Sequence, residues 1–200
     1  MSKPPTSKAL NKSPWQTRSR SKIYENPWIS ISEHQVIDPS GMPGIYGIVH
    51  MKNYAIGIIP VDERGNTWLV GQYRYALDQY SWEIPMGGSP IDQSPLEGAK
   101  RELKEETGIT ANRWELLMEL HTSNSVTNEY AQVYVATELQ FGETAHEPTE
   151  QLKIHKLPLA EAVKMAQTGE ITDAISVAAL LRIDVMNSSC ELRLRVEVTN

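Results

Sequence analysis

The chain lacks several features that mark secreted, membrane-spanning and zinc-dependent proteins. Its 200 residues contain a single cysteine, Cys190, which cannot form an internal disulfide and therefore favours a reducing cytoplasm. No apolar run approaches the ~20 residues that span a bilayer, and no hydrophobic segment follows the basic N-terminus. We therefore expect neither a membrane span nor a secretory signal. The five histidines show no HExxH or other metal-ligand spacing.

Acidic residues are missing from positions 1–22, which hold six basic residues together with several prolines and serines. This composition predicts a flexible tail over residues 1–21. The rest of the chain is consequently more acidic than the overall net charge of −6 indicates. An acidic body argues against a duplex-binding surface, so we expect no nucleic-acid partner, and a basic N-terminal arm is the less favoured alternative.

The length and the 40% hydrophobic content are enough for one domain with a sizeable core. Apolar periodicity and turn signals predict strands over residues 29–33, 45–50, 55–61, 67–75, 114–119, 131–136 and 151–156. Helices are expected over residues 159–167 and 172–184, and residues 191–198 alternate well enough for a last strand.

Residues 87–109 combine a glycine-rich loop with the start and end signals of a helix. Ser94 is the expected N-cap, Pro95 suits the first helical position, and Glu97 would complete a capping box. Gly108 supplies a left-handed stop. The expected buried stripe of this helix consists of Leu96, Ala99 and Leu103.

Three glutamates, Glu102, Glu105 and Glu106, fall within an arc of roughly 100° beside this stripe. Glu102 and Glu106 form a like-charge pair four residues apart, and the last turn of a helix disfavours carboxylates. A solvated acidic face is the alternative interpretation. Because several local rules are broken together on an otherwise well-built helix, we expect a functional site where a hard divalent cation offsets the repulsion.

The same stretch resembles the Nudix box, whose pattern is a glycine, five residues, a glutamate, seven residues and then Arg-Glu-Leu-x-Glu-Glu-x-Gly-Ile. The matching positions are Gly87, Arg101, Glu102, Leu103, Glu105, Glu106, Gly108 and Ile109. Gln93 stands where the pattern has its first glutamate. The resemblance implies an outer role for this position at the metal site, so the missing carboxylate predicts weaker metal affinity and leaves the activity in question.

Flanking segments resemble the branch of the family that hydrolyses ADP-ribose and related nucleotide sugars. They are residues 22–28, 71–75, 82–88, 125–129 and 169–174. The resemblance implies an α/β (α+β) fold, the Nudix α/β/α sandwich with a mixed sheet, over residues 54–200. A small N-terminal antiparallel sheet over residues 22–53 would precede it and contribute to a homodimer.

By the same resemblance, the cofactor is Mg²⁺, with Mn²⁺ as a substitute. Glu102 and Glu106 would be the main ligands, Glu105 a third, and the Met86 carbonyl a backbone ligand. Arg101 would position the glutamates rather than touch substrate. Two metal ions held in this way would orient the phosphate oxygens and activate the attacking water.

The resemblance places a general base in the acidic loop over residues 141–151. Glu150 is the first choice and Glu147 is close behind, with a loop that has no catalytic role as the alternative.

Substrate contacts are assigned with an alternative for each residue. Arg74 would bind phosphate or pair with a surface acid. Glu83 and Glu129 would contact ribose or orient Arg101, or else form structural salt bridges. Trp28 would stack on an adenine across a dimer, or lie in the core.

The function predicted from the sequence is magnesium-dependent hydrolysis of the diphosphate linkage of ADP-ribose or a related nucleoside-diphosphate sugar. The products would be a nucleoside monophosphate and a sugar phosphate. Two alternatives stay open: hydrolysis of dinucleoside polyphosphates, NADH or modified nucleoside triphosphates, and a Nudix domain that senses nucleotide without hydrolysing it. Gln93 favours the nucleotide-sensing alternative, whereas the intact Arg-Glu-x-x-Glu-Glu core argues against it.

Overall fold

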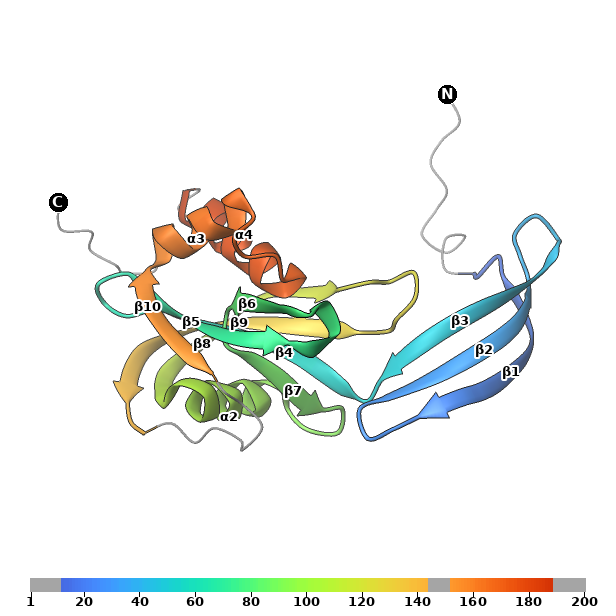
Figure 1. Ribbon diagram of the computed structural model, residues 1–200, viewed down its shortest axis with the longest axis horizontal. Helices are drawn as coiled ribbons and strands as arrows, with labels where there is room; N and C mark the ends of the chain where they lie inside the picture. Colours follow the sequence, from blue (N-terminus) through green and yellow to red (C-terminus); the bar gives the residue numbers. More distant parts are fainter. Residues whose placement is uncertain (1–11, 144–151, 189–200) are drawn as a thin grey trace, which may run out of the picture. The chain divides into compact units, whose positions relative to one another are not determined.

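The computed structural model describes residues 12–143 and 152–188, which form two compact units (Figure 1). The first unit takes in the chain up to Lys52 and the segment 123–128, and the second takes in residues 53–122 and the chain from Glu129 onward. In chain order, the elements are β1 (Gln16–Glu25), β2 (Ile29–Ile37), β3 (Pro43–Met51), β4 (Asn53–Pro60), β5 (Asn66–Arg74), the 3₁₀ turn η1 (Tyr75–Leu77), β6 (Gln79–Glu83), β7 (Met86–Pro90), α2 (Pro95–Thr107), β8 (Ile109–His121), β9 (Tyr130–Phe141), β10 (Lys153–Pro158), α3 (Leu159–Thr168) and α4 (Ala174–Ser188). Within the described ranges, none of the helices has the length and apolarity that crossing a membrane requires.

The first unit is an antiparallel sheet in the order β1-β2-β3. The Asp38 carboxylate closes the turn between β2 and β3, because it accepts the backbone N–H groups of Ser40 at 2.8 Å and Met42 at 3.0 Å. The segment 123–128 attaches to β3, where the Val49 N–H donates to the Val126 carbonyl at 2.9 Å.

Strand β1 corrects the prediction of a flexible tail over residues 1–21. Residues 16–21 belong to this strand, which pairs with β2 from Gln16 opposite Ile37 to Glu25 opposite Ser30. All of its residues are exposed, so the sequence shows no apolar alternation there, and backbone hydrogen bonds hold the strand in place. Residues 1–11 lie outside the described ranges.

The second unit contains two sheets. One is mixed, in the order β7-β4-β9-β8, with β4 and β9 parallel and the other pairs antiparallel. The other is antiparallel, in the order β10-β5-β6. Both strands that flank β4 matter for the site, because β7 leads into α2 and β9 begins just after Glu129.

Alternation along β4 divides the core of this unit into two layers. Ile56 and Ile58 pack with Ala99 and Leu103 of α2, whereas Ile59 packs with the buried residues of α3 and α4. Figure 1 shows α2 on one side of the sheets and α3 and α4 on the other. The expected α/β/α sandwich with a mixed sheet is therefore confirmed.

Helix α2 begins after Ser94 and ends before Gly108, whose φ is +70°, as predicted. The capping box is wrong, because the Ser94 side chain makes no capping hydrogen bond. Glu97, its expected partner, instead accepts a hydrogen bond from Lys100 at 2.7 Å.

Two short strands, β6 and β7, were not predicted from the sequence. Strand β7 contains two glycines and ends at Pro90, and these residue types are depleted from strands. The strand predicted over residues 191–198 lies outside the described residues.

Candidate active site

Glu102 and Glu106 meet the start of β7 on one side of α2. Glu106 is only 3% exposed, and its Oε2 accepts the backbone N–H of Met86 at 2.9 Å. The Glu102 carboxylate lies directly against the α-carbon of Gly87, since a β-carbon added there would fall 2.1 Å from Glu102 Cδ. Position 87 therefore requires glycine, because the Glu102 carboxylate leaves no room there for a side chain.

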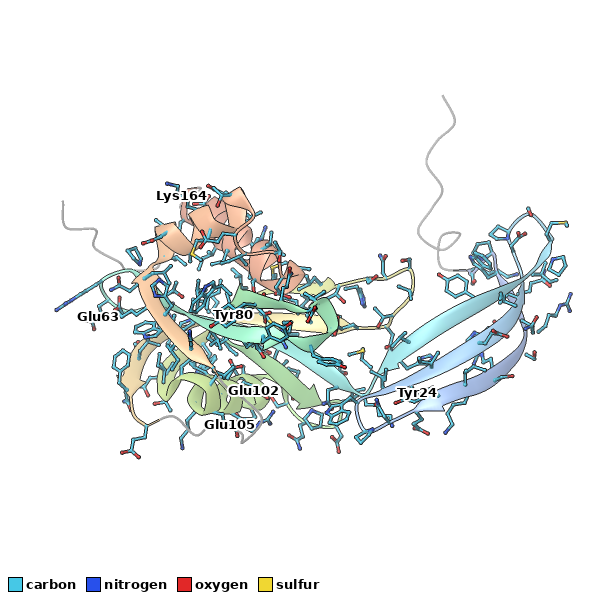
Figure 2. All side chains as sticks on the ribbon, viewed as in Figure 1. Tyr24, Glu63, Tyr80, Glu102, Glu105 and Lys164 are labelled. Atoms are coloured by element: carbon cyan, nitrogen blue, oxygen red, sulfur yellow. The ribbon has the colours of Figure 1, made fainter. Side chains whose placement is uncertain are left out.

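Arg101 links the glutamates of α2 to the backbone of β7. Its guanidinium donates from Nη2 to the Gly88 carbonyl at 2.6 Å and to Glu102 Oε1 at 2.6 Å. Its Nε lies 3.6 Å from Glu105 Oε2. Figure 2 shows Glu102 and Glu105 together on α2. One cation therefore contacts two of the three clustered carboxylates and offsets part of their mutual repulsion.

The donor set at this site fits a hard divalent cation. It consists of carboxylate and carbonyl oxygens, and the Glu102 carboxylate occupies space that only a glycine at position 87 leaves open. In the part of the chain that the structure describes, no three histidine, cysteine, aspartate or glutamate side chains converge as a ready-made metal cage. Arg101 contacts Glu102 and Glu105, and the Met86 N–H donates to Glu106.

A cavity of about 360 Å³ adjoins this corner of the second unit. Residues of β4, β5, β7 and α4 and of the segments between elements line it, among them Arg74, Met86, Gly87, Thr122, Glu129 and Asp173. Met86 and Gly87 thus belong both to the cavity wall and to the glutamate corner.

Arg74 is held in the cavity wall by Glu83. Its Nε donates to Glu83 Oε1 at 2.8 Å, and its Nη2 donates to Oε2 of the same carboxylate. Glu83 is 2% exposed, so Arg74 forms a bidentate salt bridge with a buried carboxylate. The hydrogen bond that Arg74 donates to Glu83 raises the pKa of Arg74 above its usual value, although burial acts in the opposite direction. The negative charges of Glu83, Asp173 and Glu106 raise this pKa as well.

Glu83 forms the structural salt bridge that the sequence left open, and its partner is Arg74. In the pairing of β5 with β6, Glu83 stands opposite Val70 and Arg74 opposite Gln79. The two residues therefore lie on one face of the hairpin, where their long side chains meet. Glu129 lies in the cavity wall as well, where the Thr122 hydroxyl donates to its Oε2.

Asp173 was not singled out from the sequence, although the segment around it was. Its Oδ2 accepts the Ser176 N–H at 2.8 Å and so caps the start of α4, while its position also lines the cavity. An aspartate directly before an apolar helical pattern is the signal that would have identified it.

The remaining predicted residues fall elsewhere. Trp28 belongs to the first unit and is 67% exposed, so the alternative of a core tryptophan is wrong. Gln93 is exposed in the turn before α2, where its N–H donates to the Pro90 carbonyl. Glu147 and Glu150 lie outside the described residues, and the base assigned to them stays a prediction.

Comparisons with known proteins agree with this arrangement. The NUDIX domain model matches residues 51–180, and the model of the nucleoside diphosphate sugar hydrolase N-terminal domain matches residues 15–49. An ADP-ribose pyrophosphatase of Mycobacterium tuberculosis is 30% identical over 178 residues, covering 87% of this chain and 85% of its own. An ADP-ribose pyrophosphatase of Bacillus subtilis is 28% identical, covering 82% and 90%. The crystal structure of an ADP compounds hydrolase superposes with a TM-score of 0.78 at 20% identity, over 89% of this chain and 97% of that one.

Proposed function

This chain belongs to the Nudix family, and we propose that it hydrolyses the diphosphate linkage of ADP-ribose or a related nucleoside-diphosphate sugar. The products are a nucleoside monophosphate and a sugar phosphate. The observation that carries the proposal is the corner where Glu102 packs on Gly87 and buried Glu106 holds Met86, beside a cavity that also contains Arg74. The N-terminal match to nucleoside diphosphate sugar hydrolases favours this substrate class over other nucleotides.

The glutamates of α2 are proposed to hold a divalent metal, Mg²⁺ with Mn²⁺ as a substitute. Glu102 and Glu106 would be the main ligands, with Glu105 and the Met86 carbonyl completing the set. The hydrogen bond from the Met86 N–H to Glu106 supports this, because it fixes the Met86 backbone beside the most buried carboxylate. When bound, the metal would neutralise the diphosphate oxygens and lower the pKa of the attacking water.

The protein's own groups would orient the substrate and the glutamates. Arg74 would bind a phosphate oxygen, since its fork contact with Glu83 leaves it charged and held in the cavity wall. Glu129 would contact ribose from the same wall. Arg101 would keep Glu102 and Glu105 turned toward β7 in the absence of metal. The general base is proposed to be Glu150, with Glu147 as the alternative.

A substrate panel tests this proposal. Purified protein with Mg²⁺ is incubated with ADP-ribose, GDP-mannose, NADH and diadenosine tetraphosphate, and kcat/KM is measured for each. We expect a nucleoside-diphosphate sugar to exceed the other two classes at least about tenfold, the discrimination that one well-placed contact supplies. A higher kcat/KM for NADH or for the dinucleoside polyphosphate would contradict the proposed substrate class.

The sequence predicts weaker metal affinity from the missing box glutamate, whereas the position of Gln93 in the structure predicts that restoring it changes little. Gln93 is exposed, and its backbone is tied to Pro90 in the turn before α2. Because an exposed carboxylate acts on a nearby charge only weakly through water, Gln93→Glu should alter kcat and the Mg²⁺ concentration for half-maximal rate by less than about threefold. A tenfold gain in metal affinity would show that position 93 reaches the metal.

We also propose that the protein is a cytoplasmic homodimer. Val36 is the only buried hydrophobic residue among the described residues of the first unit, while Ile23, Trp28 and Ile45 are each more than 60% exposed. A sheet with so little core of its own requires a covering surface, and exposed aromatic and aliphatic side chains suit one. Light scattering should give twice the monomer mass of 22.5 kDa, and a monomer at micromolar concentration would contradict the proposal.

A further inference from the structure

The first unit contains a cavity of about 460 Å³, and none of its lining residues has a role in the proposed reaction. All three strands line it: Arg20, Ser21 and Lys22 from β1, Ser32 and His34 from β2, and His50 from β3. We call it the basic pocket. Arg20 stands opposite His34 and Lys22 opposite Ser32 in the β1–β2 register, and Ser30 stands opposite His50. Because side chains alternate along strands, Arg20, Ser32, His34 and His50 share one face of the sheet.

Hydrogen bonds hold the two imidazoles of the basic pocket together. Ser32 Oγ lies 3.0 Å from His34 Nε2 and 2.7 Å from His50 Nε2. A hydroxyl has one proton, so Ser32 donates to one ring and accepts from the other. The two rings are therefore fixed on the sheet face, which reduces the entropy lost when a ligand binds to them.

The charges of the basic pocket are unbalanced. Among the described residues, no carboxylate lines this pocket, although the chain as a whole has a net charge of −6. Lys22 forms an ion pair with Glu25, but Arg20 has no carboxylate at ion-pair distance within residues 12–143 and 152–188. Arg20 and His34 stand directly opposite each other, so a guanidinium and an imidazole present their polar groups at one place on the sheet.

We infer that the basic pocket binds a phosphate-type dianion. The Arg20 guanidinium supplies a fork of donors, the imidazole whose Nε2 accepts from Ser32 supplies its Nδ1–H, and Lys22 adds a further positive charge to the lining. The ligand is either free phosphate or the phosphate group of a small monoester. This site consists only of residues of the first unit and shares no lining residue with the cavity that contains Arg74.

Proton NMR of the histidine ring signals tests the inference on the full-length protein. Inorganic phosphate, ribose 5-phosphate and AMP are each titrated at constant ionic strength, with His34→Asn and His50→Asn used to assign the signals. We expect the His34 and His50 signals to move together and to saturate with phosphate. Equal affinity for the three ligands identifies the phosphate group alone as the ligand, and tighter binding of ribose 5-phosphate or AMP identifies a monoester.

Two variants of equal charge distinguish the pocket from general surface charge. Arg20→Gln should weaken phosphate binding about tenfold, the loss expected for a charge-assisted hydrogen bond. Arg18→Gln removes the same charge from a bulged position of the same strand that does not line the pocket, and should leave the affinity within about twofold. Ser32→Ala should also weaken binding, because it frees the two rings. An absence of saturable shifts, or equal weakening by both arginine variants, would overturn the inference.

Discussion

Glu106→Gln should abolish turnover while leaving the protein folded. Glu106 is 3% exposed, and its Oε2 accepts the Met86 N–H, a bond that a glutamine carbonyl also accepts. The substitution therefore keeps the shape of the side chain and this hydrogen bond while it removes the negative charge. Because removal of one preorganised electrostatic contact costs about 10²–10³ in rate, and this carboxylate would also hold the metal, we expect kcat to fall on the order of 10³-fold or more.

Two measurements and a control accompany this variant. Mg²⁺ should raise the melting temperature of the wild type by selective binding to the folded state, and this increase should be lost in Glu106→Gln. Glu97→Gln is the matched control, since Glu97 lies on the first turn of the same helix, paired with Lys100. Unchanged turnover in Glu106→Gln, or an equal loss in Glu97→Gln, would refute the assignment of the metal site.

Gly87→Ala should be inactive for a steric reason. The new β-carbon would fall 2.1 Å from Cδ and 2.2 Å from Oε2 of Glu102, so the carboxylate must move. The displaced group is the far end of a flexible side chain, and the melting temperature should consequently change by only a few degrees. Since a shift of about 1 Å in a catalytic group costs about 10²-fold, we expect kcat/KM to fall by at least that factor.

Gly88→Ala is the neighbouring control for this prediction. Its β-carbon would lie 3.0 Å from Asn53 Nδ2 and would not touch the glutamates, while the Gly88 carbonyl that Arg101 contacts would be kept. Activity in Gly88→Ala should therefore stay within several-fold of the wild type. If Gly87→Ala retained full activity, the packing of Glu102 on Gly87 would have no catalytic significance.

The box helix and its glutamates could be predicted from the sequence because their signals are local. Pro95, Gly108 and the apolar stripe lie within a few turns of one another, and helical spacing alone brings Glu102 beside Glu106. The Arg74–Glu83 pair could not be predicted, because it depends on the register of β5 against β6 and on a strand that was not expected.

The residues that belong to the first unit could not be predicted from sequence patterns either. Strand β1 has only exposed residues, so its pairing with β2 leaves no periodic signal. The segment 123–128 joins this unit through backbone hydrogen bonds to β3, a strand more than 70 residues earlier in the chain. Contacts of this kind arise from tertiary folding and not from local composition.

The most direct test of the account is phosphorus NMR of ADP-ribose incubated with the full-length protein and Mg²⁺. The account predicts that the diphosphate signals disappear and that AMP and ribose 5-phosphate appear in equal amounts, with no reaction when Mg²⁺ is removed by a chelator. Intact ADP-ribose after prolonged incubation, with calorimetry showing that it still binds, would contradict the account and identify a nucleotide-binding protein without hydrolytic activity.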